Sequence, residues 1–258
     1  MNVIVTLGAT REYIDAVRFI SNASTGATGS ALADFFASKG FRVSALCAAN
    51  SIKPKNKKVE ILEFSDFSDL NGKIKNLLKT RSFDIFIHCA AVSDYSVRSP
   101  CLKTKLDSGS GTLKIILKRN FKIVERIKRY ARANPSDKKP EQGGIARNRC
   151  SEHCELPEQG GIARNRCSEH CELPEQGGIA RNRCRELYER PYLAAFKLTC
   201  AAGKKEILSA VSKLKSADIV VHNDINEKGF FHLYKNGSKT ADCRGTRELA
   251  KKILKEIP

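Results

Sequence analysis

Short, almost purely apolar segments recur along this chain and alternate with segments of helical periodicity. Residues 2–7, 83–91 and 217–223 are typical of strands that are buried on both faces of a parallel sheet. Residues 66–80 instead repeat apolar side chains at the spacing of an amphipathic helix. This alternation predicts an α/β fold with a Rossmann-like, doubly wound, mostly parallel sheet, whose ligands bind at the carboxyl ends of the strands.

Apolar spacing and turn residues also predict the remaining elements. Further strands are expected at 41–47, 59–64, 113–118 and 192–199, and a candidate hairpin arm at 230–234. Further helices are expected at 30–38, 122–133, 204–215 and 246–257. The polar segment 95–112 contains two glycines and is expected to be a long loop.

A repeated segment interrupts this pattern. The string PEQGGIARNRCSEHCEL occupies residues 140–156 and recurs unchanged at 157–173, and its first eleven letters recur at 174–184. Each full copy offers only one Ile and one Leu, too little apolar surface to offset the entropy of ordering. We therefore expect one domain made of residues 1–139 and 185–258, with a mobile insert at 140–184. The Cys-Ser-Glu-His-Cys within each copy could bind zinc, but it matches no common structural site, so no side chain is assigned to a metal.

The chain carries a formal net charge of +18. Such an excess can indicate nucleic-acid binding, but no recognition-helix, RNA-binding or zinc-finger motif is present, so we expect anionic small molecules and no nucleic acid. The sequence has no apolar run of about 18 residues and no signal-peptide pattern after Met1, which predicts a cytoplasmic protein without membrane association. Its ten cysteines are expected to be free thiols in that reducing compartment.

Glycines and small residues follow the first predicted strand. Gly8 ends that strand, and Gly26 and Gly29 precede the first helix, where backbone N–H groups can bind an anion. An NAD(P)-dependent reductase is the main alternative, but it requires G-x-G-x-x-G here and an acid after the second strand. Neither is present: no glycine lies between Gly8 and Gly26, and residues 45–49 read Ala-Leu-Cys-Ala-Ala.

Four segments together resemble a known family. They read TLGATREYIDAVRFISNASTGATG (6–29), HCAAVSDY (88–95), AAFKLT (194–199) and KSADIVVHNDI (215–225). In this order they are similar to the signatures of phosphopantothenate–cysteine ligases. The resemblance covers essentially the whole chain outside 140–184, and the long middle of the first segment is its most specific part.

The resemblance implies a reaction and its participants. Family members activate the carboxylate of 4′-phosphopantothenate with CTP or ATP, accompanied by Mg²⁺, and release pyrophosphate. The amine of L-cysteine then attacks the acyl-nucleotide intermediate, giving 4′-phosphopantothenoyl-cysteine and the nucleoside monophosphate in coenzyme A synthesis. The resemblance also implies a homodimer with a lysine-bearing flap near the partner subunit. Since the ligase motif follows Met1 directly, no flavin-dependent decarboxylase domain and no flavin are expected.

Site residues follow from the same resemblance. The catalytic residues are expected to be Asn22, whose amide can hold the activated acyl group, and the flap lysine Lys103, with Lys105 as the alternative. The expected nucleotide-binding residues are His88, Cys89, Ala90, Asp94, Lys103, Asn120, Phe121, Phe196, Lys213 and Lys215. The expected substrate and phosphate loop consists of Gly8, Arg18, Asn22, Ser24, Thr25, Gly26, Gly29 and Asn223.

Two segments depart from the family pattern. Asn120-Phe121-Lys122-Ile123 stands where the family has N-P-D-I, which replaces an aspartate by a lysine. Ala27-Thr28 stands where the family has Lys-Met, which removes a lysine from the phosphate loop. These departures keep open a third hypothesis, a catalytically impaired nucleotide-binding homologue.

Overall fold

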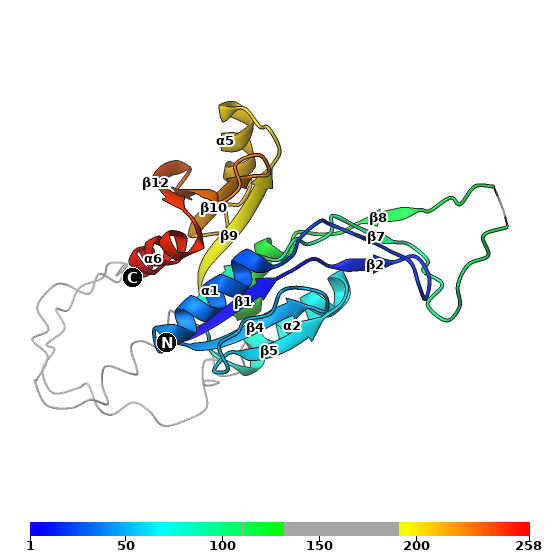
Figure 1. The fold of residues 1–258 in the computed structure, drawn as a ribbon, viewed down its shortest axis with the longest axis horizontal. Helices are drawn as coiled ribbons and strands as arrows, with labels where there is room; N and C mark the ends of the chain where they lie inside the picture. The colour runs from blue at the N-terminus through cyan, green and yellow to red at the C-terminus, as the bar shows by residue number, and fades with distance from the viewer. Residues whose placement is uncertain (110, 132–190) are drawn as a thin grey trace, which may run out of the picture. The chain divides into compact units, whose positions relative to one another are not determined.

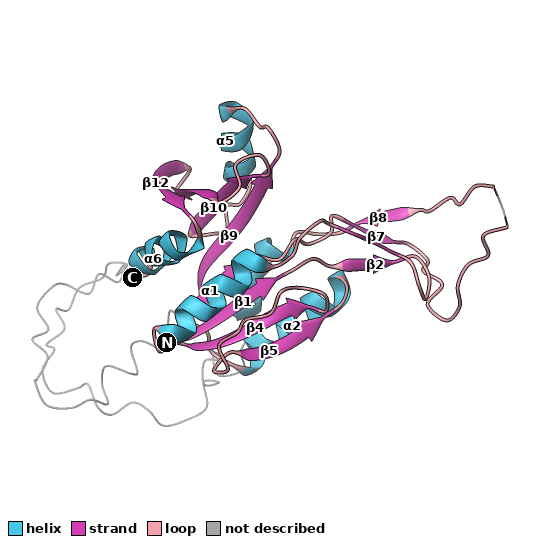
Figure 2. Ribbon diagram, viewed as in Figure 1, coloured by secondary structure: helices cyan, strands magenta, loops and turns pink. Residues whose placement is uncertain are grey.

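The structure is a computed structural model that describes residues 1–109, 111–131 and 191–258, which belong to one compact unit. An eight-stranded sheet lies at its centre in the order β12-β11-β10-β9-β6-β1-β4-β5 (Figures 1 and 2). The strands are β1 (Asn2–Leu7), β4 (Arg42–Ala48), β5 (Glu60–Phe64), β6 (Ile85–His88), β9 (Tyr192–Thr199), β10 (Ile219–Asp224), β11 (Phe230–Lys235) and β12 (Ser238–Arg244). All neighbouring pairs are parallel except β10–β11 and β11–β12. The predicted Rossmann-like, mostly parallel sheet is therefore confirmed.

Helices cover both faces of this sheet. They are α1 (Ala27–Ser38), α2 (Phe67–Thr80), the 3-10 helix η1 (Ile123–Glu125), α3 (Ile127–Ala131), α5 (Lys204–Ser212) and α6 (Thr246–Glu256). Alternate residues of β1 face opposite layers: Val3 packs with α1 and α6, while Ile4 packs with α2 and α3. Asp66 begins α2 by accepting a hydrogen bond from the Asp69 amide. None of the helices in these ranges is long and apolar enough to cross a membrane.

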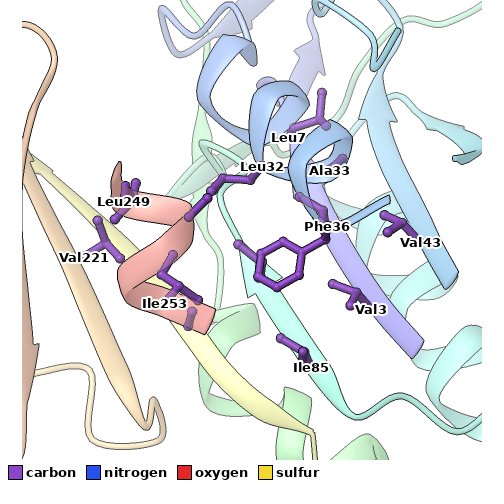
Figure 3. Close-up of a cluster of buried hydrophobic side chains, with 14 of the residues drawn as sticks. Val3, Leu7, Leu32, Ala33, Phe36, Val43, Ile85, Val221, Leu249 and Ile253 are labelled. Atoms are coloured by element: carbon purple, nitrogen blue, oxygen red, sulfur yellow. The ribbon is translucent and has the colours of Figure 1, made fainter. Parts of the chain in front are cut away.

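The centre of the sheet joins two parts of the chain that are distant in sequence. β6 pairs with β9, so that Ile87 lies opposite Ala194. Helix α6, near the carboxyl terminus, returns to pack beside α1, and Leu249 and Ile253 lie in one buried cluster with Leu32 (Figure 3). Burying each such aliphatic side chain stabilises the fold by roughly 1.5–3 kcal/mol. This helix pair thus links the two halves of the sheet.

Two short antiparallel ribbons accompany the sheet. One pairs β2 (Arg11–Tyr13) with β3 (Phe19–Ser21), and the other pairs β7 (Tyr95–Val97) with β8 (Leu117–Arg119). β2 also contacts β7, and Figure 1 shows the two ribbons running together. We refer to these four strands and their connections as the double ribbon.

The double ribbon and its surroundings correct several predicted elements. The segment 95–112 begins with a strand instead of being a loop throughout, and the strand predicted at 113–118 is observed at Leu117–Arg119. The helix predicted at 122–133 is divided into η1 and the short α3. Strand β12 was not predicted; it follows a tight turn at Asn236-Gly237, where both residues have positive φ, as two-residue hairpins require. The predicted insert at 140–184 lies outside the described residues.

Candidate active site

Three glycines, Gly8, Gly26 and Gly29, form a close contact between the first strand and the first helix, which we call the glycine cradle. Gly8 and Gly26 have φ values of +85° and +77°. A Cβ on Gly8 would lie 2.5 Å from the Cβ of Ala48, and one on Gly29 would lie 2.6 Å from the Cβ of Leu7. Residues without a side chain therefore let the amino end of α1 approach the carboxyl ends of β1 and β4. The positive end of the helix dipole lies there, which favours an anionic group.

The connection from β3 to α1 supplies two more predicted loop residues. The carbonyl of Thr25 accepts from the Ile52 amide at 2.8 Å, and its hydroxyl accepts from the Ala27 amide at 3.4 Å. Ser24 is half-buried beside it. The predicted phosphate-loop residues 24–29 therefore form one continuous segment that enters the helix at the cradle.

Two threonines, Thr6 and Thr10, accept hydrogen bonds from the segment that follows β6. The amides of Cys89 and Ala90 donate to the carbonyl and the hydroxyl of Thr6, at 3.1 and 3.3 Å. The hydroxyl of Thr10 accepts from the Ser93 amide at 2.9 Å. These contacts hold the predicted nucleotide-binding segment 88–94 against the strand that precedes the cradle.

His88 is part of this junction but faces inward. Its Nδ1 lies 2.9 Å from the Thr6 hydroxyl, and burial lowers the pKa of the ring to about 4. The imidazole is therefore neutral near pH 7 and joins two strands. Its neighbour Cys89 adjoins the cradle, because a Cβ on Gly29 would lie 3.4 Å from the Cβ of Cys89.

Asp94 and Asn120 lie together in a hydrogen-bonded network. The Asn120 amide donates to the Asp94 carbonyl at 2.8 Å, and Asn120 Nδ2 donates to the Ser96 hydroxyl at 2.8 Å. Ser96 in turn donates to the buried carboxylate of Glu12 at 2.5 Å, which also accepts from the Phe67 amide at the start of α2. The structure thus brings two predicted nucleotide-binding residues together and adds Glu12, which the sequence analysis did not single out.

The departure at Lys122 has a structural counterpart. The Lys122 ammonium pairs with the Asp94 carboxylate, and both side chains are largely exposed. The neighbouring Phe121 is half-buried: its ring centroid lies 3.3 Å from the Arg126 guanidinium carbon and 4.9 Å from that of Phe67. In this chain, the Asp94 carboxylate is therefore already paired with a lysine.

Thr199 and Asp224 face each other at the carboxyl ends of β9 and β10. The Thr199 hydroxyl donates to Asp224 at 2.6 Å, and the amides of Asn226 and Ala201 donate to it at 3.0 and 3.1 Å. The Thr199 hydroxyl, followed by these amides, lowers the pKa of Asp224 to about 2. Asp224 therefore fixes the turns after both strands. The sequence analysis did not select it, although it lies within the recognised segment 215–225.

The last four predicted site residues lie on or before strands β9 and β10, but not at the same end of these strands. Phe196 and Asn223 are half-buried on adjacent strands, towards the carboxyl edge. Lys213 and Lys215 are exposed and precede β10, so they lie near the amino end of that strand. The structure therefore does not place the two lysines at the edge that carries the cradle.

Asn22 and Lys103 lie towards opposite ends of the β2–β3 hairpin. Asn22 follows Ser21, which pairs with Arg11 at the end of the hairpin that joins the sheet. The segment containing Lys103 contacts the hairpin turn, where the Ala16 amide donates to the carbonyl of Thr104. Both predicted catalytic side chains are exposed. Within a single protomer, they do not lie close together.

Arg18 also belongs to the hairpin turn. Its guanidinium donates to Asp15 Oδ2 at 2.8 Å and to the carbonyl of Leu106 at 2.6 Å. Arg18 therefore contacts the segment that carries Lys103, not the glycine cradle. Within the described ranges no three His, Cys, Asp or Glu side chains could jointly hold a metal ion.

The amino-terminal half of the chain is similar to a known family. Residues 1–136 match the family described as the C-terminal domain of the DNA/pantothenate metabolism flavoprotein. The chain is 36% identical over 126 residues to the coenzyme A biosynthesis bifunctional protein CoaBC of Thermococcus kodakarensis. It is 39% identical over 130 residues to the protein of the same name from Methanocaldococcus jannaschii. Each match covers 49% of this chain and 30% of the relative, so the matched part spans less than a third of these relatives.

Solved structures share the fold of the described residues beyond the part that matches the family. The DNA/pantothenate metabolism flavoprotein from Streptococcus pneumoniae superposes with a TM-score of 0.68 at 19% identity, covering 100% of this chain and 98% of that one. A mutant of Cab2 in complex with phosphopantothenate-cysteine superposes with a TM-score of 0.62 at 15% identity, covering 99% and 84%. The match over residues 1–136, more than half of the sequence, identifies this chain as a member of the DNA/pantothenate metabolism flavoprotein C-terminal domain family.

Proposed function

We propose that this protein is a phosphopantothenate–cysteine ligase of coenzyme A synthesis. The main observation in support is the convergence of the glycine cradle and Cys89 at the carboxyl edge of the sheet, beside the positive end of α1. The reaction brings three anionic groups together, and a helix amino end can offset part of their repulsion without adding a mobile charge. The names of the relatives and of the Cab2 complex point to the same chemistry.

In this proposal, CTP or ATP activates the carboxylate of 4′-phosphopantothenate, and the L-cysteine amine attacks the resulting acyl nucleotide. The Asn22 amide donates to the acyl oxygen, while the Lys103 ammonium closes over the activated bond and excludes water. Asp94 and Asn120 contact the nucleotide. Mg²⁺ would bind together with the triphosphate that it accompanies. We place this reaction in the cytoplasm and assign it no flavin.

We further propose that the active enzyme is a homodimer in which the flap of one protomer serves the cradle of the other. The separation of Asn22 from Lys103 along the hairpin supports this arrangement. The double ribbon also exposes large apolar side chains: Val17, Phe19, Ile20, Tyr95, Leu102, Ile116 and Leu117. Apolar surface of this kind favours a protein partner, and a second copy satisfies both observations.

Mixing two inactive variants tests the shared site. Asn22→Asp and Lys103→Gln dimers are dissociated together and reassociated. If the flap acts across the dimer, each mixed dimer keeps one intact site, and the mixture regains about one quarter of the wild-type rate, since half the dimers are mixed. If the mixture stays inactive although mass spectrometry detects mixed dimers, the flap acts within its own chain.

The ligase proposal itself is tested with purified protein, phosphopantothenate, cysteine, Mg²⁺ and each nucleoside triphosphate in turn. Pyrophosphate release that depends on phosphopantothenate is expected with CTP or ATP. Its absence with every nucleotide would refute the activity, and NADPH oxidation would favour the reductase. The Lys122–Asp94 ion pair favours a second candidate function, a catalytically impaired nucleotide-binding homologue. In that case, the wild-type protein should bind the nucleotide weakly, and the Lys122→Asp variant should bind it more tightly.

A further inference from the structure

The hairpin turn contains a carboxylate whose environment the ligase chemistry described above does not explain. Asp15 is fully buried, although it lies in a short turn of the double ribbon and not in the core of the central sheet. Burial alone would raise the pKa of this carboxyl group, but the hydrogen bonds from three backbone amides and from Arg18 outweigh burial and hold the pKa well below its usual range. Asp15 is therefore charged and fully satisfied in the folded protein.

The two oxygens of Asp15 serve different segments. Oδ1 accepts from the amides of Val17 and Arg18, at 2.8 and 2.7 Å, and thus closes its own turn. Oδ2 accepts from the Leu106 amide at 3.1 Å and from Arg18 Nε at 2.8 Å. The Arg18 guanidinium also donates to the Leu106 carbonyl, so that both backbone polar groups of Leu106 are held by this ion pair.

Leu106 ends the segment that carries Lys103 and Lys105. The start of that segment is held as well, because the Cys101 amide donates to the carbonyl of Ile14 at 3.0 Å. A residue that only needed to close a β2–β3 turn could use one oxygen, as Asp commonly does in turns. The second oxygen instead spans 91 positions of sequence to reach the lysine segment.

We propose that Asp15, acting through Arg18 and Leu106, is a positioning residue that fixes the lysine-bearing flap in its catalytic register. This inference rests on the ligase proposal. Asp15 itself touches no substrate. Its contribution is to restrict the flap so that an ammonium group is held where the acyl nucleotide forms, and a displacement of about 1 Å in such a group can cost about a hundredfold in rate.

The variant Asp15→Asn separates the two roles of the side chain. The remaining carbonyl oxygen can still close the turn through Val17 and Arg18, but an NH₂ group would face the Leu106 amide, donor against donor. The matched control is Asp107→Asn, the same chemical change on an exposed aspartate one residue beyond Leu106. Hydrogen–deuterium exchange of the Leu106 amide reports the flap directly and does not require activity.

In the wild type we expect the Leu106 amide to exchange at least about tenfold more slowly than an unstructured amide. Asp15→Asn should remove this protection and lower kcat for ligation by about tenfold to a hundredfold, with the KM for the nucleotide unchanged. Asp107→Asn should change neither quantity.

Three outcomes would overturn the inference. They are an unprotected Leu106 amide in the wild type, an Asp15→Asn variant that keeps the flap protected, and one that opens the flap but ligates at the wild-type rate. If Asp15→Asn does not fold, the wild-type exchange measurement still tests the inference: a protected Leu106 amide supports it and an unprotected one overturns it. A wild-type protein that makes no product marks a failure of the ligase proposal instead, and the positioning role then fails with it.

Discussion

Replacing Gly8 by alanine tests how closely the first strand and the phosphate loop are packed. Two effects act on the new methyl group. First, Gly8 has a φ of +85°, a conformation that costs an L-residue about 1–2 kcal/mol. Second, the methyl carbon would lie 2.5 Å from the Cβ of Ala48 and 2.8 Å from that of Ser51, so the backbone must shift. Overpacking of this kind costs about 1–3 kcal/mol.

Gly40 offers a matched control that isolates the packing effect. It has the same φ of +85°, but a Cβ there would meet nothing within 4 Å. Alanine at either position also lowers the entropy of the unfolded chain, which stabilises the folded protein by about 0.4–1 kcal/mol. Gly40→Ala should therefore destabilise the protein by about 0–1.5 kcal/mol, and Gly8→Ala by about 1–3 kcal/mol more than that.

Urea unfolding followed by circular dichroism measures both free energies. The two variants should share the wild-type m value, so that the difference appears in the midpoint concentration. If Gly8→Ala unfolds at the same urea concentration as Gly40→Ala, the neighbouring strand end accommodates a methyl group. The glycine cradle would then not depend on the absence of a side chain at Gly8.

Three further predictions concern the site and its surroundings. The Asn22→Asp and Lys103→Gln variants should fold normally but lose about a hundredfold or more in the rate of product formation, whereas Lys105→Gln should lose less. If Lys105→Gln loses more activity than Lys103→Gln, the flap lysine is Lys105. The folded state keeps His88 neutral down to about pH 4, while the unfolded chain binds the proton below about pH 6.5. Its contribution to stability is thus complete above pH 6.5 and is lost, by up to about 3 kcal/mol, as the pH falls towards 4; His88→Gln should remove this component from urea unfolding curves. Deleting residues 140–184 should leave the melting temperature and the ligase rate unchanged, and unfolding of the deletion variant would contradict the prediction that this segment is an insert outside the domain.

The main sheet was predictable because its strands carry their own signal. Val3–Val5 in β1 and Ile219–Val221 in β10 are buried and apolar, and this pattern is visible in the sequence without knowledge of which strands pair. Helix α2 was equally clear, because Asp66 marks its start and its apolar residues share one face.

The double ribbon could not be found in the same way. Strands β3 and β8 are only three residues long, and all three residues of each are exposed, so neither shows the alternation of buried apolar and exposed polar residues that marks a strand. β7 also finds its partner far along the chain, with Tyr95 opposite Arg119. Pairing of this kind depends on tertiary contacts that a window of local sequence does not contain.

The candidate site was predictable only as a set of recognised segments. Motif matching selected Gly8 and Asn22 but passed over Asp15 and Asp224, although both lie inside matched segments. The roles of these carboxylates depend on burial and on amides donated by other segments, which the sequence does not reveal.

The pairing of β6 with β9 makes the described chain a molecule in two halves. Residues 1–131 supply β5, β4, β1 and β6, and residues 191–258 supply the other four strands and α6. The two sets of strands meet through the β6–β9 pairing and through the contact of α6 with α1, so their association depends on these packed surfaces. The chain is thus suited to fragment complementation: two separately encoded polypeptides, divided between β6 and β9, should reassemble into the intact sheet.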